Sequence, residues 1–143
     1  MKVLFDTSVL VPAFVDQLSN HTAAFVCFTT YTSGEHEGFC STHALAETYS
    51  VLTSLPLPKR ISSAEAHLII QENLLKRLSV VELRTQDYLN ALKLVSQNGL
   101  TGGIVYDALH LEAAKKARCI RVYTYNVGHF QSLSPDEQLI SSP

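Results

Sequence analysis

The sequence has few charged residues and almost no excess of either sign. Only 17% of its 143 residues are Asp, Glu, Lys or Arg, compared with about 25% in typical soluble domains. This composition argues against a disordered chain, because disorder is typical of polar, strongly charged sequences. The 11 Lys and Arg against 13 Asp and Glu leave a net charge of −2, which disfavours a protein that holds nucleic acid through a general positive field.

Cysteines and long apolar runs are also scarce. The three cysteines, Cys27, Cys40 and Cys119, are odd in number and match no zinc spacing, so neither a disulfide framework nor a zinc site is predicted. No run approaches 18 apolar residues, and Asp6 interrupts the first apolar segment, so neither a transmembrane helix nor a signal peptide is predicted. We therefore expect a cytoplasmic protein with no membrane partner.

Apolar residues make up 46% of the chain, enough for a hydrophobic core. The length suits one domain rather than two, and the sequence contains no repeat, linker or low-complexity segment. We expect a single domain over residues 1–143, with about 134–143 as a loose C-terminal tail.

Short apolar runs alternate with helical patterns along the chain. The runs at 3–5, 39–41, 80–83 and 120–123 predict short strands, and the first lacks polar alternation, as expected of a strand buried on both faces. The clearest helical pattern covers 104–117. Strands that alternate with helices indicate an α/β fold with a mostly parallel central sheet.

Two aspartates lie where apolar residues are expected. Asp6 directly follows the first predicted strand, at the edge where parallel sheets bind ligands; a helix N-cap explains this aspartate equally well. Asp107 shares a helix face with Ile104 and Leu111, where an unpaired carboxylate is costly. The helix dipole also favours an acid in the first turn, but we favour a functional role for Asp107.

Glu47 lies in the middle of a predicted helix, between Ala44 and Val51 at helical spacing, and by itself it also fits an exposed helical glutamate. Together, however, the three acids favour a function, because Asp6, Glu47 and Asp107 belong to three separate βα units. Carboxylate oxygens suit hard cations such as Mg²⁺ or Mn²⁺. The reaction that fits such a site is metal-assisted phosphodiester hydrolysis.

Four segments resemble, in the same order, the motifs of PIN-domain ribonucleases. They cover residues 3–10, 41–47, 106–114 and 124–130. The length and the motif order resemble VapC-type toxins of bacterial toxin–antitoxin pairs. The resemblance implies a three-layer α/β/α fold and an endoribonuclease that depends on Mg²⁺ or Mn²⁺. It also implies an RNA substrate, an antitoxin partner and a homodimer.

The resemblance also implies roles for individual residues. Asp6, Glu47 and Asp107 match the acidic metal-site positions, and Asn126 falls at a fourth position where many members of the family have Asp. An amide oxygen can still coordinate a metal or orient a water molecule, but it adds no negative charge. We therefore expect one metal ion, or a second that binds only together with the RNA phosphate.

Thr7 and Thr124 could orient a carboxylate or a water molecule at this site, although a turn hydroxyl explains each of them equally well. His43 and His110 stand at helical spacing from Glu47 and Asp107 and could approach the rim of the site, but packing or surface positions are favoured. Three tyrosines could stack on RNA bases, although a position in the core is favoured for most of them. They are Tyr31, Tyr106 and Tyr125.

Two other functions fit the sequence less well. A catalytically weak PIN-like module that binds RNA or an antitoxin stays open because Asn126 replaces an acid. A phospho-accepting receiver domain is disfavoured, because Asp6 lacks an acidic neighbour and residues 124–126 contain no lysine.

Overall fold

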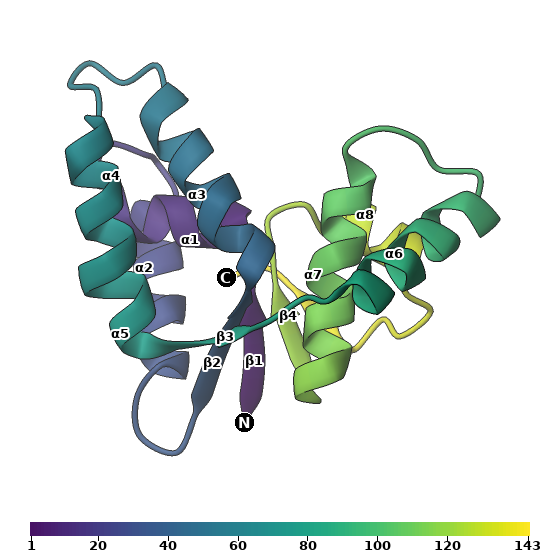
Figure 1. Cartoon of the computed structure of the whole chain (residues 1–143). Helices are drawn as coiled ribbons and strands as arrows, with labels where there is room; N and C mark the ends of the chain where they lie inside the picture. Colours follow the sequence, from purple (N-terminus) through teal and green to yellow (C-terminus); the bar gives the residue numbers. More distant parts are fainter.

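The computed structural model describes all 143 residues and contains a five-stranded sheet in which every pairing is parallel (Figure 1). The strands are β1 (Lys2–Phe5), β2 (Glu37–Ser41), β3 (Leu78–Val81), β4 (Arg121–Tyr123) and β5 (Ile140–Ser141). Their order in the sheet is β3-β2-β1-β4-β5. This order differs from the 2-1-3-4-5 order of receiver domains, which removes the receiver alternative.

Helices cover both faces of the sheet. They are α1 (Thr7–Phe14), α2 (His21–Tyr31), α3 (Thr42–Ser54), α4 (Ser63–Ile69), the π-helix η1 (Ile70–Leu74), α5 (Leu75–Arg77), α6 (Thr85–Gln97), α7 (Ile104–Ala117) and α8 (Val127–Leu133). Figure 1 shows α1 to α5 on one side of the sheet and α6 to α8 on the other. The predicted three-layer α/β/α fold is confirmed. None of the helices combines the length and the apolar character that crossing a membrane requires.

Neighbouring residues of the central strand β1 enter two different cores. Val3 and Phe5 pack with residues of α1, α2 and α3, whereas Leu4 packs with residues of α6, α7 and α8. All three side chains are fully buried. Because successive residues of a strand point to opposite faces, this strand needs apolar side chains at every position, as its sequence pattern predicts.

The C-terminal segment is not the loose tail that the sequence suggests. Ile140 and Ser141 form β5, which pairs with β4 in parallel register. The Ile140 side chain is buried in the core beneath α6, α7 and α8. A two-residue strand is too short to show a periodic pattern, so its pairing with the edge of β4 cannot be recognised from the sequence.

The carboxyl ends of β1 and β2 lead directly into helices through capping residues. Asp6 is the N-cap of α1 and accepts a hydrogen bond from the Ser8 backbone N–H. Ser41 is the N-cap of α3 and accepts one from the Ala44 N–H. Short polar side chains at these positions satisfy N–H groups that have no partner within the helix, and they bring polar atoms to one edge of the sheet.

Candidate active site

The structure brings the four predicted site residues to the carboxyl edge of the sheet, from four different elements. Asp6 follows β1, Glu47 lies in α3, Asp107 lies in the first turn of α7, and Asn126 precedes α8. Asp6 and Asp107 are buried, Glu47 is partly exposed and Asn126 is exposed. Two open pockets, of about 570 and 400 Å³, meet here, and both are lined by Glu47 and Asn126.

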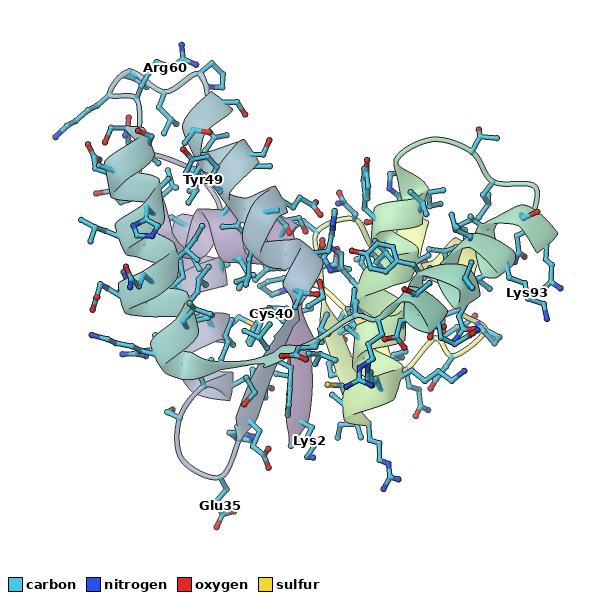
Figure 2. All side chains as sticks on the ribbon, viewed as in Figure 1. Lys2, Glu35, Cys40, Tyr49, Arg60 and Lys93 are labelled. Atoms are coloured by element: carbon cyan, nitrogen blue, oxygen red, sulfur yellow. The ribbon has the colours of Figure 1, made fainter.

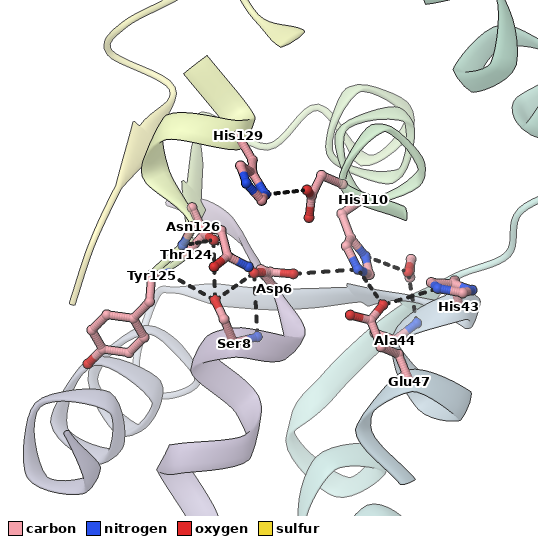
Figure 3. Close-up of polar contacts among 12 residues, drawn as sticks. Asp6, Ser8, His43, Ala44, Glu47, His110, Thr124, Tyr125, Asn126 and His129 are labelled. Carbon is pink, nitrogen blue, oxygen red and sulfur yellow. Dashed lines mark hydrogen bonds and ion pairs between the residues drawn. The ribbon is translucent and has the colours of Figure 1, made fainter. Parts of the chain in front are cut away.

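One carboxylate oxygen of Asp6 is held by hydroxyl groups (Figure 3). The Ser8 hydroxyl donates to Asp6 Oδ2 at 2.6 Å, and the Thr124 hydroxyl donates to the same oxygen at 2.8 Å. Each hydroxyl oxygen also accepts from the backbone, Ser8 from the Tyr125 N–H and Thr124 from the Asn126 N–H. The main chain that follows β4 therefore orients Asp6 through two side chains, and neither hydroxyl group binds Oδ1.

Thr7 does not take the orienting role that we expected for it. Its side chain is buried, but its hydroxyl has no hydrogen-bond partner. The Asp6 side chain instead faces Ser8, the second residue of the helix, whose backbone N–H and hydroxyl both donate to Oδ2. Ser8, rather than Thr7, is therefore the residue that contacts Asp6. Thr124, by contrast, lies in the orienting position that the sequence suggests.

His110 is fully buried between the acids and connects three elements (Figure 3). Its Nε2 lies 3.2 Å from Glu47 Oε2 and 3.5 Å from Asp6 Oδ1. Carboxylate oxygens only accept hydrogen bonds, so we assign the proton to Nε2. Its Nδ1 lies 3.0 Å from the hydroxyl of Ser41, the N-cap of α3. His110 therefore links α7 both to Glu47 and to the start of the helix that carries Glu47.

The charges around His110 decide its protonation. Burial disfavours the imidazolium, but the hydrogen bond to Glu47 and the charges of Asp6, Glu47 and Asp107 outweigh burial and raise the pKa of His110. Burial likewise raises the pKa of Glu47, but its contacts with His110 and His43 prevail and hold that pKa below the usual value. His43 Nε2 lies 3.0 Å from Glu47 Oε2, so two histidines face this carboxylate.

Asp107 has fewer partners than Asp6. Its only side-chain hydrogen bond or ion pair is with His129, whose Nδ1 lies 3.2 Å from Asp107 Oδ2. Burial and the nearby charge of Asp6 raise the pKa of Asp107 from 3.8 to about 6, against the opposing effects of His110 and His129. A raised carboxyl pKa of this kind shows that negative charge at this position is incompletely balanced.

The donor set fits a hard divalent cation. Histidines are the only basic side chains paired with the three acids, and neither pocket is lined by a lysine or an arginine. One side-chain atom each of Asp6, Glu47 and His110 lies within 4.8 Å of the other two, and the proton assigned to His110 Nε2 leaves the two carboxylates as the metal donors of this group. Asp107 lies outside that tight group but lines the larger pocket with Glu47. Oxygen donors with unbalanced negative charge are what Mg²⁺ and Mn²⁺ prefer.

Sequence reasoning missed several residues of this arrangement. Ser8 and Ser41 carry no signal beyond that of ordinary turn and cap residues. His43 and His110 have a visible signal, their spacing of four and three residues from Glu47 and Asp107, but this spacing equally suits packing. His129 approaches Asp107 only because α8 folds back onto α7.

Comparison with known proteins agrees with the motif pattern. The PIN domain family profile matches residues 3–133. Ribonuclease VapC27 of Mycobacterium tuberculosis is 36% identical over 113 residues, which cover 79% of this chain and 77% of the relative. Ribonuclease VapC40 of the same species is 35% identical over 112 residues, covering 78% of each chain.

Solved structures share the fold at low sequence identity. The crystal structure of M. tuberculosis VapC20, described as a Sarcin-Ricin loop cleaving toxin, gives a TM-score of 0.74 at 15% identity and covers 91% of this chain and 94% of its own. The structure of VapBC2 from Rickettsia felis, bound to a promoter DNA fragment, gives a TM-score of 0.69 at 15% identity and covers 100% of this chain and 99% of its own. With the sequence matches and the acidic edge of the sheet, these likenesses show that the chain belongs to the PIN-domain family.

Proposed function

We propose that this protein is a metal-dependent endoribonuclease of the VapC type, acting in the cytoplasm as the toxin of a toxin–antitoxin pair. The observation that carries the proposal is the meeting of Asp6, Glu47 and Asp107 at one open edge of the sheet, with no lysine or arginine beside them. The relatives named ribonuclease VapC support RNA as the substrate.

Asp6, Glu47 and Asp107 would hold Mg²⁺ or Mn²⁺. The bound ion would neutralise charge on the scissile phosphate and lower the pKa of the attacking water. Asp6 presents Oδ1 in a fixed direction because Ser8 and Thr124 hold its other oxygen.

His110 and Asn126 have supporting roles in this proposal. The Nε2–H of His110 keeps Glu47 turned toward Asp6. The side chain of Asn126 lines both pockets and would orient a water molecule or the phosphate through its amide. Because the amide adds no negative charge, we propose that one ion binds tightly in the absence of RNA.

We also propose an antitoxin partner and a homodimer. Structural neighbours described as VapBC2 and VapBC-1 support the antitoxin, which would cover the acidic pocket with a basic side chain. The cheapest observation is a short gene that overlaps the upstream end of this one. Its product should co-purify with this protein and inhibit cleavage, and light scattering should give twice the chain mass.

The nuclease itself is tested with purified protein and labelled structured RNA in Mg²⁺, in Mn²⁺ and in EDTA. We expect cleavage that requires metal and is lost in both Asp6→Ala and Asp107→Ala. Asp16→Ala, which alters an exposed acid outside the site, is the matched control for a contaminating ribonuclease. Cleavage in EDTA, or full activity of either site variant, would contradict the mechanism.

The weak-module alternative predicts a different result in the same experiment. Asn126 in place of an acid is the observation that favours it. A module that only binds would retain RNA in a gel-shift assay in Mg²⁺ and Mn²⁺ without shortening it. Asn126→Asp would then be expected to bring back cleavage.

A further inference from the structure

The pockets at the acidic edge offer RNA no strong cation to bind. Neither pocket is lined by lysine or arginine, and the labelled residues Arg60 and Lys93 lie at the periphery of the molecule (Figure 2). Lys2 lies at the start of β1, with its Nζ over the Phe39 ring. Contacts between phosphates and basic side chains supply most of the affinity in ordinary nucleic-acid binding. Apart from the proposed metal ion at the scissile phosphate, an RNA strand in these pockets would therefore gain its affinity from uncharged contacts.

Tyr106 is the tyrosine that is open to the larger pocket. It lies immediately before Asp107 in the first turn of α7, and 48% of its surface is exposed. It lines the 570 Å³ pocket together with Glu47, Asp107 and Asn126. By contrast, Tyr31 and Tyr125 are partly buried against the core beneath α1 and α2. Of the three tyrosines that the sequence offers for stacking, only Tyr106 lines this pocket.

The ring of Tyr106 is held in place from one side. The His43 ring stacks on it with a centroid distance of 4.8 Å and an interplanar angle of 14°. The Nε2 atom of His43 lies 3.0 Å from Glu47 Oε2. His43 therefore covers part of the Tyr106 ring, while 48% of the residue stays exposed at the pocket.

We propose that Tyr106 is a stacking platform for an unpaired nucleobase of the RNA, beside the phosphate to be cleaved. Every base has a flat π face, so a half-exposed aromatic ring binds single-stranded RNA without needing a charge. A ring already oriented by His43 loses little conformational freedom on binding. Paired bases are stacked within their helix and cannot use the platform, so the pocket takes single-stranded segments. This inference rests on the proposed function, because it assumes an RNA substrate.

The first test uses a single-stranded RNA oligonucleotide that the wild-type protein cleaves. Tyr106→Leu keeps an apolar side chain but removes the ring, and we expect KM to rise about 5- to 100-fold, the usual effect of losing one stacked base. Stacking acts equally on bound substrate and transition state, so kcat should stay within about threefold. Tyr106→Phe keeps the ring and should stay within about twofold of wild type in KM. Tyr88→Leu, at a similarly exposed tyrosine of α6, is the matched control.

Two further measurements separate stacking from other causes. Calorimetric titration with Mn²⁺ should give the same affinity for Tyr106→Leu and wild type, since a disturbed metal site would weaken it. Fluorescence anisotropy of labelled single-stranded RNA in EDTA measures binding without cleavage, and Tyr106→Leu should weaken it by the same factor as KM.

The outcomes distinguish this inference from the proposed function. Wild-type cleavage with Tyr106→Leu equal to Tyr88→Leu would overturn the platform and leave the nuclease standing. A loss in Tyr106→Phe as large as in Tyr106→Leu would also overturn it, because the hydroxyl would then be the binding group. Ring-dependent RNA binding without any cleavage would support the platform and overturn the nuclease.

Discussion

Asp6 and Asp107 are two buried carboxylates of one site in unlike surroundings. At the end of β1, one oxygen of Asp6 receives two hydroxyl hydrogen bonds of 2.6 and 2.8 Å, and both hydroxyls are anchored to the main chain after β4. At the start of α7, Asp107 has a single partner, His129, whose side chain is 65% exposed. Asp6, after strand β1, is held by a hydrogen-bond network, and we call it the ordered half of the site. Asp107, in helix α7, has one polar partner, and we call it the helix half.

The two aspartates therefore differ in role: Asp6 is held in a fixed orientation, and Asp107 is buried with little to balance its charge. Two hydroxyl hydrogen bonds orient the Asp6 carboxylate. Asp107 keeps an unfavourable charge, visible in its pKa of about 6. A site that was satisfied throughout would have little reason to bind a cation, whereas a site with no network would not hold its ligands in position. Variants of Asp6, Asp107 and their partners test the two halves, with expected effects from the largest to the smallest.

Asp6→Asn tests whether RNA cleavage needs the Asp6 carboxylate, the ordered half of the site. The amide keeps the shape of the side chain but removes a negative charge and replaces one acceptor oxygen by a donor. Losing several kcal/mol of transition-state stabilisation corresponds to a fall of about 10³-fold or more in kcat/KM. The measurement is RNA cleavage in Mn²⁺, with Asp16→Asn as control. Activity within tenfold of wild type would mean that the ordered carboxylate is not needed.

His110→Ala removes the residue that connects the two halves. Groups that orient metal ligands typically contribute 10- to 100-fold in affinity, so we expect Mn²⁺ binding by calorimetry to weaken about 10- to 100-fold. His110→Gln, which can still donate a hydrogen bond, should recover part of the loss. The control is His67→Ala, at an exposed histidine of α4. Wild-type affinity in His110→Ala would show that Glu47 needs no such support.

Asp6→Asn and Asp107→Asn should have opposite effects on the stability of the metal-free protein. The folded pKa of Asp107, about 6, lies above its ordinary value of 3.8. The folded state therefore binds the Asp107 proton more tightly than the unfolded state. This adds to the free energy of unfolding in full below about pH 4, and the gain is lost as the pH rises through about 6. Asp107→Asn should then stabilise the protein at pH 7.5 by about 1–2 kcal/mol, a figure reduced for partial burial. Asp6→Asn should destabilise it, because strong hydrogen bonds weaken.

Urea unfolding in EDTA between pH 4.5 and 8 measures both effects. The advantage of Asp107→Asn should shrink steadily as the pH falls. Protonation of Asp107 should also weaken Mn²⁺ binding by the wild type below about pH 6, since a metal ligand must be deprotonated. If Asp107→Asn destabilises the protein at pH 7.5, the helix half is better satisfied than its contacts indicate.

The smallest effect comes from two adjacent hydroxyls in the ordered half. Ser8→Ala removes a donor to Asp6 and leaves the Tyr125 N–H without its partner, which should cost about 1–3 kcal/mol. Thr7→Val removes a buried hydroxyl that has no partner, so stability should change by less than about 0.5 kcal/mol or increase. Urea unfolding of the pair gives the comparison. Equal losses would mean that the Ser8 contacts add nothing specific.

Much of the framework follows from short-range sequence signals. The helix predicted at 104–117 is α7, with the same bounds, because the glycines before it and the periodicity within it are unambiguous. Ser62 lies directly before α4, and its hydroxyl caps that helix by accepting a hydrogen bond from the Glu65 N–H. For Asp6, the N-cap is confirmed and the metal-ligand role stays a prediction: Oδ2 caps α1 while Oδ1 faces His110. A carboxylate has two oxygens, so a cap and a ligand are compatible.

The polar network could not be predicted in the same way. His110 reaches Ser41 and Glu47 across 69 and 63 residues of sequence, and no local pattern encodes contacts at such separations. The choice of Ser8 over Thr7 depends on which side chain of the first helical turn faces Asp6. The pairing of β5 depends on an edge that exists only once β4 has joined the sheet.

The sequence by itself determined which carboxylates lie at the sheet edge and which elements carry them, because apolar periodicity and caps act within a few residues. Only the tertiary structure decided which of their oxygens are occupied, where His110 places its proton and which tyrosine opens to the pocket. Those properties depend on distances of 3 to 5 Å between elements remote in sequence. Such distances are set by how the helices pack on the two faces of the sheet.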